Sequence, residues 1–238
     1  MLIIGLDTAT LTLSLALVER DDTGGDRVLD HREIPPPTPH SSLLPSELDA
    51  MFQHTGRSID ALGAIVVGLG PGSFTGLRVG LATTRAIALA RQIPLVGASS
   101  LKAMAHAAIA KSAQGALLVP VLDARKGEVY GGFFRVSATG LDVVSAEFVM
   151  PPAQLAERLR TEFAESDVRV FGPGRAAYPV LHALPALTSA TTEPTPEAAS
   201  LIASVQVLPP YSREAILALE PHYVRPSDLE WKLSHPQA

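Results

Sequence analysis

The sequence contains no cysteine, and this absence excludes several kinds of site at once. Without thiols there is no disulfide framework, no thiolate metal site and no cysteine nucleophile. Charged residues are also scarce: they form 18% of the 238 residues, whereas hydrophobic residues form 47%, a balance typical of a globular chain. The net charge of −5 gives no global reason to expect tight binding to nucleic acid.

Acidic residues are missing from one long stretch of the chain. No aspartate or glutamate lies between Asp60 and Asp123, but five basic residues do: Arg78, Arg85, Arg91, Lys102 and Lys111. Ordinary solvated helix faces account for this imbalance most simply. The alternative is a basic face for an anionic partner, which the net charge would hide.

The apolar opening, MLIIGLDTATLTLSLALV, lacks the basic segment of a signal peptide. Asp7 and several threonines and serines interrupt it, so it does not fit a membrane-spanning helix either. We therefore expect a cytoplasmic protein with no membrane association.

The hydrophobic pattern predicts an α/β fold whose first half is repeated. Strands are predicted at residues 2–7, 13–19, 27–33, 64–68 and 95–99, and helices at 42–56, 75–91 and up to 111. From residue 117 a strand–strand–strand–helix–strand pattern returns, with Asp123 in the place of Asp7. We interpret this as an internal duplication. A further helix is predicted to start at Thr195.

The stretch GLGPGSFTGLRVG, residues 68–80, joins a predicted strand to a predicted helix and looks like a phosphate-binding loop. It lacks the Gly-Lys-Ser/Thr ending of a Walker loop and the acid that a dinucleotide site needs further on. It also contains no Gly-x-Ser-x-Gly elbow. Backbone amides at the helix start could still hold an anion, but packing is the better explanation for the glycines.

Two aspartates, Asp7 and Asp123, close the first strand of each predicted repeat. Actin-like ATPases place carboxylates there, near a magnesium–phosphate group, although Asp also commonly caps turns. Ala9 stands where a glycine would let a phosphate approach the backbone. A vestigial nucleotide site would comprise Asp7, Thr8, Asp123, Gly172 and Gly174. No two of the seven histidines lie within four residues, so no helical metal pair exists and no metal site is predicted.

The predicted helix at residues 75–91 is apolar almost all round, with Arg78 and Arg85 marking its only clearly wet edge. Such a helix must be buried almost all round. We expect its glycine side to face away from the chain's own sheet, toward another protein, together with the helix at residues 42–56. The predicted partner-binding residues are Leu44, Leu48, Met51, Phe52, Gly76, Val79, Gly80, Thr83 and Ile87.

The motifs IIGLDTAT, GPGSFTGLRVGLATTRAIAL, LDARKGEVYGGFF and PHYVR resemble the TsaB (YeaZ) family over most of the chain. This resemblance implies an actin-like ATPase (ribonuclease H-like) fold, with two duplicated lobes that each hold a mixed five-stranded sheet and helices. It also implies kinship with the M22 glycopeptidase-like proteins. The lobes would be residues 1–112 and 113–238, with the last helix and tail packing back on the first lobe.

The same resemblance implies a non-catalytic subunit required for threonylcarbamoylation of the adenosine next to the tRNA anticodon. Its partners would be a TsaD-like transferase and a TsaE-like ATPase, tRNA through the complex, and a second copy when alone. The chain lacks the two-histidine metal motif of TsaD. It would need no cofactor of its own, with ATP and magnesium entering only in the complex. Two alternatives remain: an independent ATPase or kinase, and a metallopeptidase.

Overall fold

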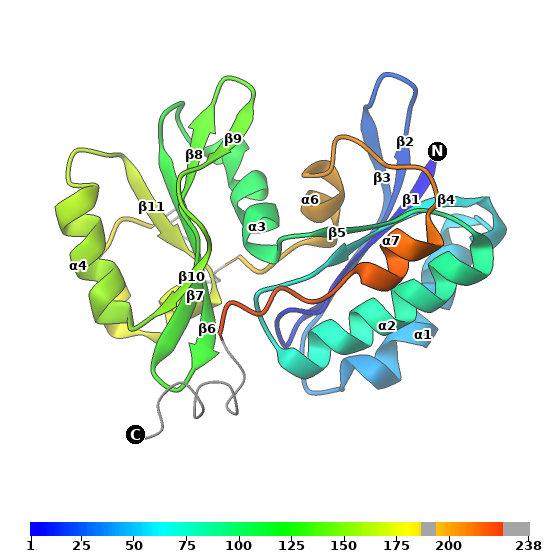
Figure 1. Cartoon of the computed structure of the whole chain (residues 1–238), viewed down its shortest axis with the longest axis horizontal. Helices are drawn as coiled ribbons and strands as arrows, with labels where there is room; N and C mark the ends of the chain where they lie inside the picture. Colours follow the sequence, from blue (N-terminus) through cyan, green and yellow to red (C-terminus); the bar gives the residue numbers. More distant parts are fainter. Residues whose placement is uncertain (187–193, 226–238) are drawn as a thin grey trace.

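The computed structural model describes residues 1–186 and 194–225, which form two lobes side by side (Figure 1). The first lobe contains β1 (Leu2–Asp7), β2 (Leu13–Arg20), β3 (Asp26–Ile34), α1 (His40–Thr55), η1 (Ile59–Ala61), β4 (Leu62–Gly68), α2 (Phe74–Arg91), β5 (Leu95–Ala98), α3 (Ser100–Ala108) and η2 (Ile109–Lys111). The second contains β6 (Leu117–Arg125), β7 (Glu128–Gly131), β8 (Phe134–Ser137), β9 (Gly140–Val143), β10 (Phe148–Met150), α4 (Pro152–Glu162), β11 (Val168–Phe171), α5 (Pro173–Ala177) and η3 (Pro179–Leu181). The helices α6 (Ala198–Ala203) and α7 (Arg213–Ala218) follow.

The first sheet has the strand order β3-β2-β1-β4-β5. Its central strand β1 pairs antiparallel with β2 and parallel with β4, and every residue of β1 is buried. Helices cover both faces, which is why β1 and β4 are apolar on both sides. One face packs on α1 and α2 through a cluster that includes Leu15, Met51 and Ile65. The opposite face packs on α3 and α6 through Ile3 and Ile202, among others.

The second sheet has six strands where five were expected, and all but β6 are short. β6 pairs antiparallel with both β7 and β8, and parallel with β11 on its other side. β7 and β8 lie end to end, separated by Gly132 and Phe133, and β10 and β9 pair with them in the same way. Each pair of short strands therefore occupies the place of one long strand. The fifth position is reduced to a single parallel bridge between Val170 and Ala186.

The duplicated fold is confirmed by this topology, because both lobes place their successive strands in the order third, second, first, fourth. Asp7 is the last residue of β1, while Asp123 lies two residues before the end of β6. Some boundaries differ from the prediction. α1 begins at His40, α6 has Glu197 rather than Thr195 as its N-cap residue, and α7 was not predicted.

The two last helices pack on the first lobe. α6 lies against α3 and the strands β1, β2 and β4, and α7 lies against α2 (Figure 1). The Ser14 hydroxyl accepts a hydrogen bond from the Ala198 N–H at 2.8 Å, which fixes the start of α6 on β2. Whether residues 1–112 and 113–238 fold as separate domains stays a prediction. Within the described ranges, every helix is too short or too polar to cross a membrane.

The glycine side of α2 packs on the chain's own β1, which corrects the expectation that it faces away from the sheet. A Cβ at Gly76 would overlap the Thr8 carbonyl oxygen, and a Cβ at Gly80 would overlap the Thr8 hydroxyl and lie 3.3 Å from Leu6. The helix wheel placed both glycines on one stripe, but the wheel alone cannot say which neighbour covers them. Here the neighbour is the end of β1.

Gly80→Leu should therefore destabilise folding. A leucine would have to displace Thr8, which is fully buried, and overpacking of this kind costs about 1–3 kcal/mol. Ala82→Leu is the matched control, because Ala82 lies on the exposed side of the same helix. Thermal and urea unfolding of the two variants measure the difference. Equal stability of the two variants would contradict the close packing of Gly80 on Thr8.

Candidate functional site

The loop between β4 and α2 lies directly on the turn that follows β1. The Ser73 N–H donates to the Ala9 carbonyl at 2.7 Å, and the Ser73 hydroxyl caps α2 by accepting from the Gly76 N–H at 3.2 Å. A Cβ at Gly72 would overlap the Ala9 carbonyl oxygen. Carbonyl oxygens therefore face these glycines, where a phosphate would need N–H donors. The elaborate loop serves the packing of α2 on β1.

Asp7 is buried at the start of this contact, with 1% of its surface exposed. Its carboxylate accepts hydrogen bonds from the Ser100 hydroxyl at 2.6 Å and the Ala9 N–H at 2.8 Å. Burial raises the pKa of Asp7 to about 6, although these two hydrogen bonds lower it. A Cβ at Gly68 would overlap the same carboxylate, so the surrounding space is filled. Asp7 thus joins the end of β1 to the start of α3.

Three other members of the predicted nucleotide site, Asp123, Gly172 and Gly174, lie in the second lobe and have contacts of their own. Asp123 accepts from the Tyr178 hydroxyl at 2.9 Å and the Arg125 N–H at 2.8 Å. A Cβ at Gly172 would lie 2.6 Å from the Val121 carbonyl oxygen, and one at Gly174 would lie 2.9 Å from Leu122. These glycines let α5 approach β6, as Gly72 and Gly76 let α2 approach β1. Thr8, Asp7's neighbour, is buried beneath α2.

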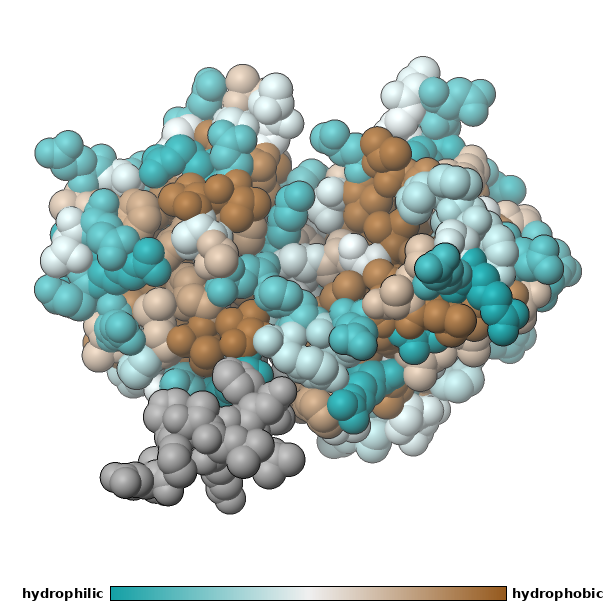
Figure 2. Space-filling view, viewed as in Figure 1, coloured by the Kyte–Doolittle hydropathy of each residue, from teal (hydrophilic) through white to brown (hydrophobic). Residues whose placement is uncertain are grey.

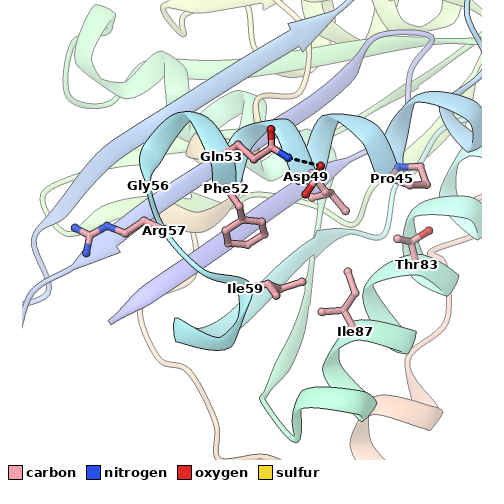
Figure 3. A pocket seen from close by; sticks show the side chains of 10 residues that line it. Pro45, Asp49, Phe52, Gln53, Gly56, Arg57, Ile59, Thr83 and Ile87 are labelled. Atoms are coloured by element: carbon pink, nitrogen blue, oxygen red, sulfur yellow. Dashed lines mark hydrogen bonds between the residues drawn. The ribbon is translucent and has the colours of Figure 1, made fainter.

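An open groove of about 520 Å³ lies between α1 and α2 (Figure 3). We call it the α1–α2 groove. It is lined by Pro45, Leu48, Asp49, Phe52, Gln53, Gly56, Arg57, Ile59, Thr83 and Ile87, and its lining is mainly apolar. Phe52, Ile59 and Ile87 point into it from three different elements (Figure 3). Gly56 adopts the left-handed conformation with φ 63°, which ends α1 and turns the chain toward Ile59.

Four of the nine predicted partner-binding residues line this groove: Leu48, Phe52, Thr83 and Ile87. The others lie elsewhere. Leu44 and Met51 are fully buried in the first lobe's core, and Val79 is half-buried against it. Gly76 and Gly80 pack on Thr8. The stripe that was interpreted as one face therefore divides between the core and the groove, because α1 and α2 each contact the sheet as well as each other.

The predicted wet edge of α2 is partly covered by the segment that follows α7. The Arg85 guanidinium donates to the Leu219 carbonyl, and the Arg78 guanidinium donates to the Tyr223 hydroxyl at 3.0 Å while lying 3.8 Å from the Phe74 ring centre. Arg91 pairs with Asp60. Three of the five basic residues in the acid-free stretch are thus engaged within the chain and form no common basic face.

Residues 219–225, which we call the strap, run from α7 across to the second lobe (Figure 1). The His222 N–H donates to the Leu69 carbonyl at 2.7 Å, and its ring lies 3.4 Å from the Glu147 carboxylate. At the far end the Arg225 guanidinium donates to the Ala124 carbonyl at 2.8 Å and pairs with Glu128. The strap holds the two lobes to each other. The PHYVR motif was its only sequence signal, and its role was not predicted.

Hydrophobic residues on the face shown in Figure 2 occur as separate patches over both lobes, with hydrophilic residues between them. No group of three or more His, Asp or Glu residues that could hold a metal occurs within residues 1–186 and 194–225.

Two lobes with the same strand order, related by duplication and joined by helices, define the actin-like ATPase class of folds. Solved structures agree. A Pseudomonas aeruginosa protein described as similar to the peptidase YeaZ matches with a TM-score of 0.73 and 24% identity, over 94% of this chain and 99% of that one. YeaZ from the same organism matches with a TM-score of 0.67 and 26% identity, over 86% and 91%.

Sequence comparisons give the family. A family model described as TsaD, tRNA N6-adenosine threonylcarbamoyltransferase, matches residues 37–193. The tRNA threonylcarbamoyladenosine biosynthesis protein TsaB of Haemophilus influenzae is 30% identical over 97% of this chain and 95% of its own length. TsaB of Escherichia coli is 34% identical over 67% of each chain. The chain belongs to the TsaB (YeaZ) family.

The raised pKa of Asp7 predicts a specific pH dependence of stability. The folded carboxyl binds its proton more tightly than the unfolded one, whose pKa is about 3.8, so folding takes up a proton between about pH 4 and 6. The free energy of unfolding should therefore fall as the pH rises through this window, by about 3 kcal/mol from this group. Asp7→Asn should remove that fall, because the amide does not ionise.

Urea unfolding of the wild type and Asp7→Asn at several pH values from 4 to 8 isolates this contribution, because the other titrating groups are common to both. Asp22→Asn, at an exposed position, is the control and should leave the pH profile nearly unchanged. Parallel profiles for the wild type and Asp7→Asn would show that the pKa of the buried carboxyl is not raised.

Proposed function

We propose that this chain acts in the biosynthesis of threonylcarbamoyladenosine in tRNA, as a non-catalytic subunit that supports a TsaD-like transferase. Membership of the TsaB family supports the pathway, since the curated relatives in that family are named for it. The match to the TsaD family model supports a transferase partner of related fold, because two proteins of related fold present similar surfaces to each other.

The observation that carries the non-catalytic role is the state of the two aspartates. Asp7 is buried and bonded to Ser100 and Ala9, and Asp123 is bonded to Tyr178 and Arg125. A carboxylate that holds a magnesium–nucleotide group needs free oxygens facing a solvent-accessible space. Here the oxygens are engaged within the chain, and the neighbouring glycines are covered by its own carbonyls. This arrangement disfavours both alternatives, the independent ATPase and the metallopeptidase.

The TsaD-like partner docks at the α1–α2 groove in this proposal. The groove is apolar at its floor, through Leu48, Phe52 and Ile87, and polar at its rim, through Asp49 and Arg57. An apolar centre inside a polar rim is the usual anatomy of a protein interface. The TsaE-like ATPase and tRNA then join through the TsaD-like subunit. In the absence of that partner, the same groove would favour pairing of two copies of this chain.

Thr83→Lys should weaken binding of the TsaD-like protein from the same organism by about ten- to a hundredfold. The lysine would place a charge in the lining of the groove, and burying it without a partner would cost about 1–3 kcal/mol or more. Folding should be spared, because Thr83 is only half-buried. Gln154→Lys on the exposed face of α4 adds the same charge in the other lobe and is the control.

Titration calorimetry with the partner, alongside thermal melts of the free variants, measures this effect. Equal affinity of Thr83→Lys and the wild type would mean that the partner docks elsewhere. A loss of affinity shared by Gln154→Lys would mean that added charge, rather than its position, is responsible.

The isolated chain should neither bind Mg-ATP in calorimetry nor hydrolyse it, because both aspartates are engaged within the chain. Asp123→Ala should accordingly leave the background rate of phosphate release unchanged. Metal-dependent ATP hydrolysis by the isolated wild type that disappears in Asp7→Ala or Asp123→Ala would contradict the non-catalytic assignment.

A further inference from the structure

A second cavity, of about 420 Å³, lies where the two lobes meet on the side of the sheet opposite the α1–α2 groove. Three elements line it: α3, the turn between β8 and β9 with the start of β9, and the end of α6. Its polar lining residues are Lys102, His106, Thr139, Ser204 and Gln206. We call it the α3 cavity. These elements border the notch between the lobes at the top of Figures 1 and 2.

Two basic side chains in this cavity, Lys102 and His106, lack an acidic partner within the described residues. Lys102 and His106 are four residues apart on α3 and therefore share one face of the helix. Neither forms an ion pair with a carboxylate in the described part of the chain, whereas Arg91 in the same acid-free stretch pairs with Asp60. The lack of acids noted in the sequence thus has a local consequence, because it leaves positive charge facing an open cavity.

The end of α6 would normally present carbonyl oxygens to this space, which would repel an anion. Arg20 on β2 forms hydrogen bonds with this end of α6. Its guanidinium donates to the Val205 carbonyl at 2.9 Å and the Ile202 carbonyl at 3.2 Å, while it is paired with Asp26. Two carbonyl oxygens at the end of α6 are therefore engaged by hydrogen bonds from Arg20.

Two of the remaining polar groups can act as donors, because Thr139 carries a hydroxyl and Gln206 an amide N–H. The Ser204 hydroxyl donates instead to the Leu201 carbonyl at 2.8 Å, and no carboxylate occurs among the lining residues. The Lys102 ammonium, the His106 imidazole and the neutral donors of Thr139 and Gln206 form a set that suits a phosphate oxyanion. We propose that the α3 cavity binds the phosphate group of a small phosphorylated molecule. This site is independent of partner docking, because it lies on the other face of the first sheet.

His106 couples such binding to pH. Burial and the charge of Lys102 both lower the pKa of the imidazole, and these two residues are the titratable groups in the cavity lining. An anion placed beside them would favour the charged imidazolium and raise its pKa. Because binding is then linked to proton uptake, affinity should increase as the pH falls.

The test uses the isolated full chain with inorganic phosphate and, separately, sulfate. Sulfate does not titrate near neutral pH, so any pH dependence of its binding belongs to the protein. We expect saturable binding of both ions by NMR, with shifts confined to the α3 cavity and sulfate binding that is at least threefold tighter at pH 6 than at pH 8. Lys102→Gln should weaken binding at least fivefold, and His106→Gln should remove the pH dependence.

Lys111→Gln is the matched control, because Lys111 is exposed on η2 outside the cavity. An equal loss in Lys111→Gln and Lys102→Gln would overturn the proposal, as would the absence of saturable ion binding. Adenosine monophosphate and a short single-stranded RNA of equal phosphate concentration distinguish the sources of the phosphate. Binding of the RNA that depends on Lys102, without binding of the monophosphate, would overturn the small-molecule ligand in favour of a nucleic-acid backbone.

Discussion

The contact between α2 and the turn after β1 is the constraint on which the first lobe depends. Three glycines, at positions 72, 76 and 80, face the Thr8–Ala9 backbone and the Thr8 side chain at distances that leave no room for a Cβ. The contact fixes α2 at one height and rotation on the sheet. That rotation turns Thr83 and Ile87 toward α1, so the α1–α2 groove exists because the other side of the helix is seated so closely.

The same contact also makes this loop unsuited to binding the phosphate of a nucleotide. In a nucleotide-binding version of such a loop, glycines leave backbone N–H groups free to approach phosphate. Here the Ser73 N–H donates to the Ala9 carbonyl and the Gly76 N–H to the Ser73 hydroxyl, while the Ala9 and Thr8 carbonyl oxygens face Gly72 and Gly76. The second lobe repeats the device on a smaller scale, with Gly172 and Gly174 against β6, but α5 has only five residues against eighteen in α2. Among the described residues, α2 packs beside α1 in the first lobe, whereas α5 in the corresponding place of the second lobe is a single short helix. The duplication is therefore asymmetric at the surface even where the sheets agree.

Much of this could be predicted from the sequence, because local patterns encode local structure. The strands of the first sheet, the two long helices and the repeat with its paired aspartates follow from periodicity and turn residues. The direction of the glycine stripe could not be predicted, since two neighbours of similar chemistry compete for one helix face. The broken strands of the second sheet and the strap were also missed. They depend on contacts such as that of Phe148 with Gly131 and that of Arg225 with Glu128. These residues are far apart in the sequence, and no hydrophobic periodicity links them.

The acid-free stretch between Asp60 and Asp123 shows why charge composition has to be interpreted on the folded chain. Arg78 and Arg85 form hydrogen bonds with Tyr223 and Leu219 of the strap, and Arg91 pairs with Asp60. Their charges therefore contribute to holding α2 in place. Lys102 and His106 occupy the other face of the sheet, where the strap does not reach and no carboxylate lines the cavity. One composition bias thus divides into a structural part on α2 and a part on α3 that leaves the charge of Lys102 available to a ligand.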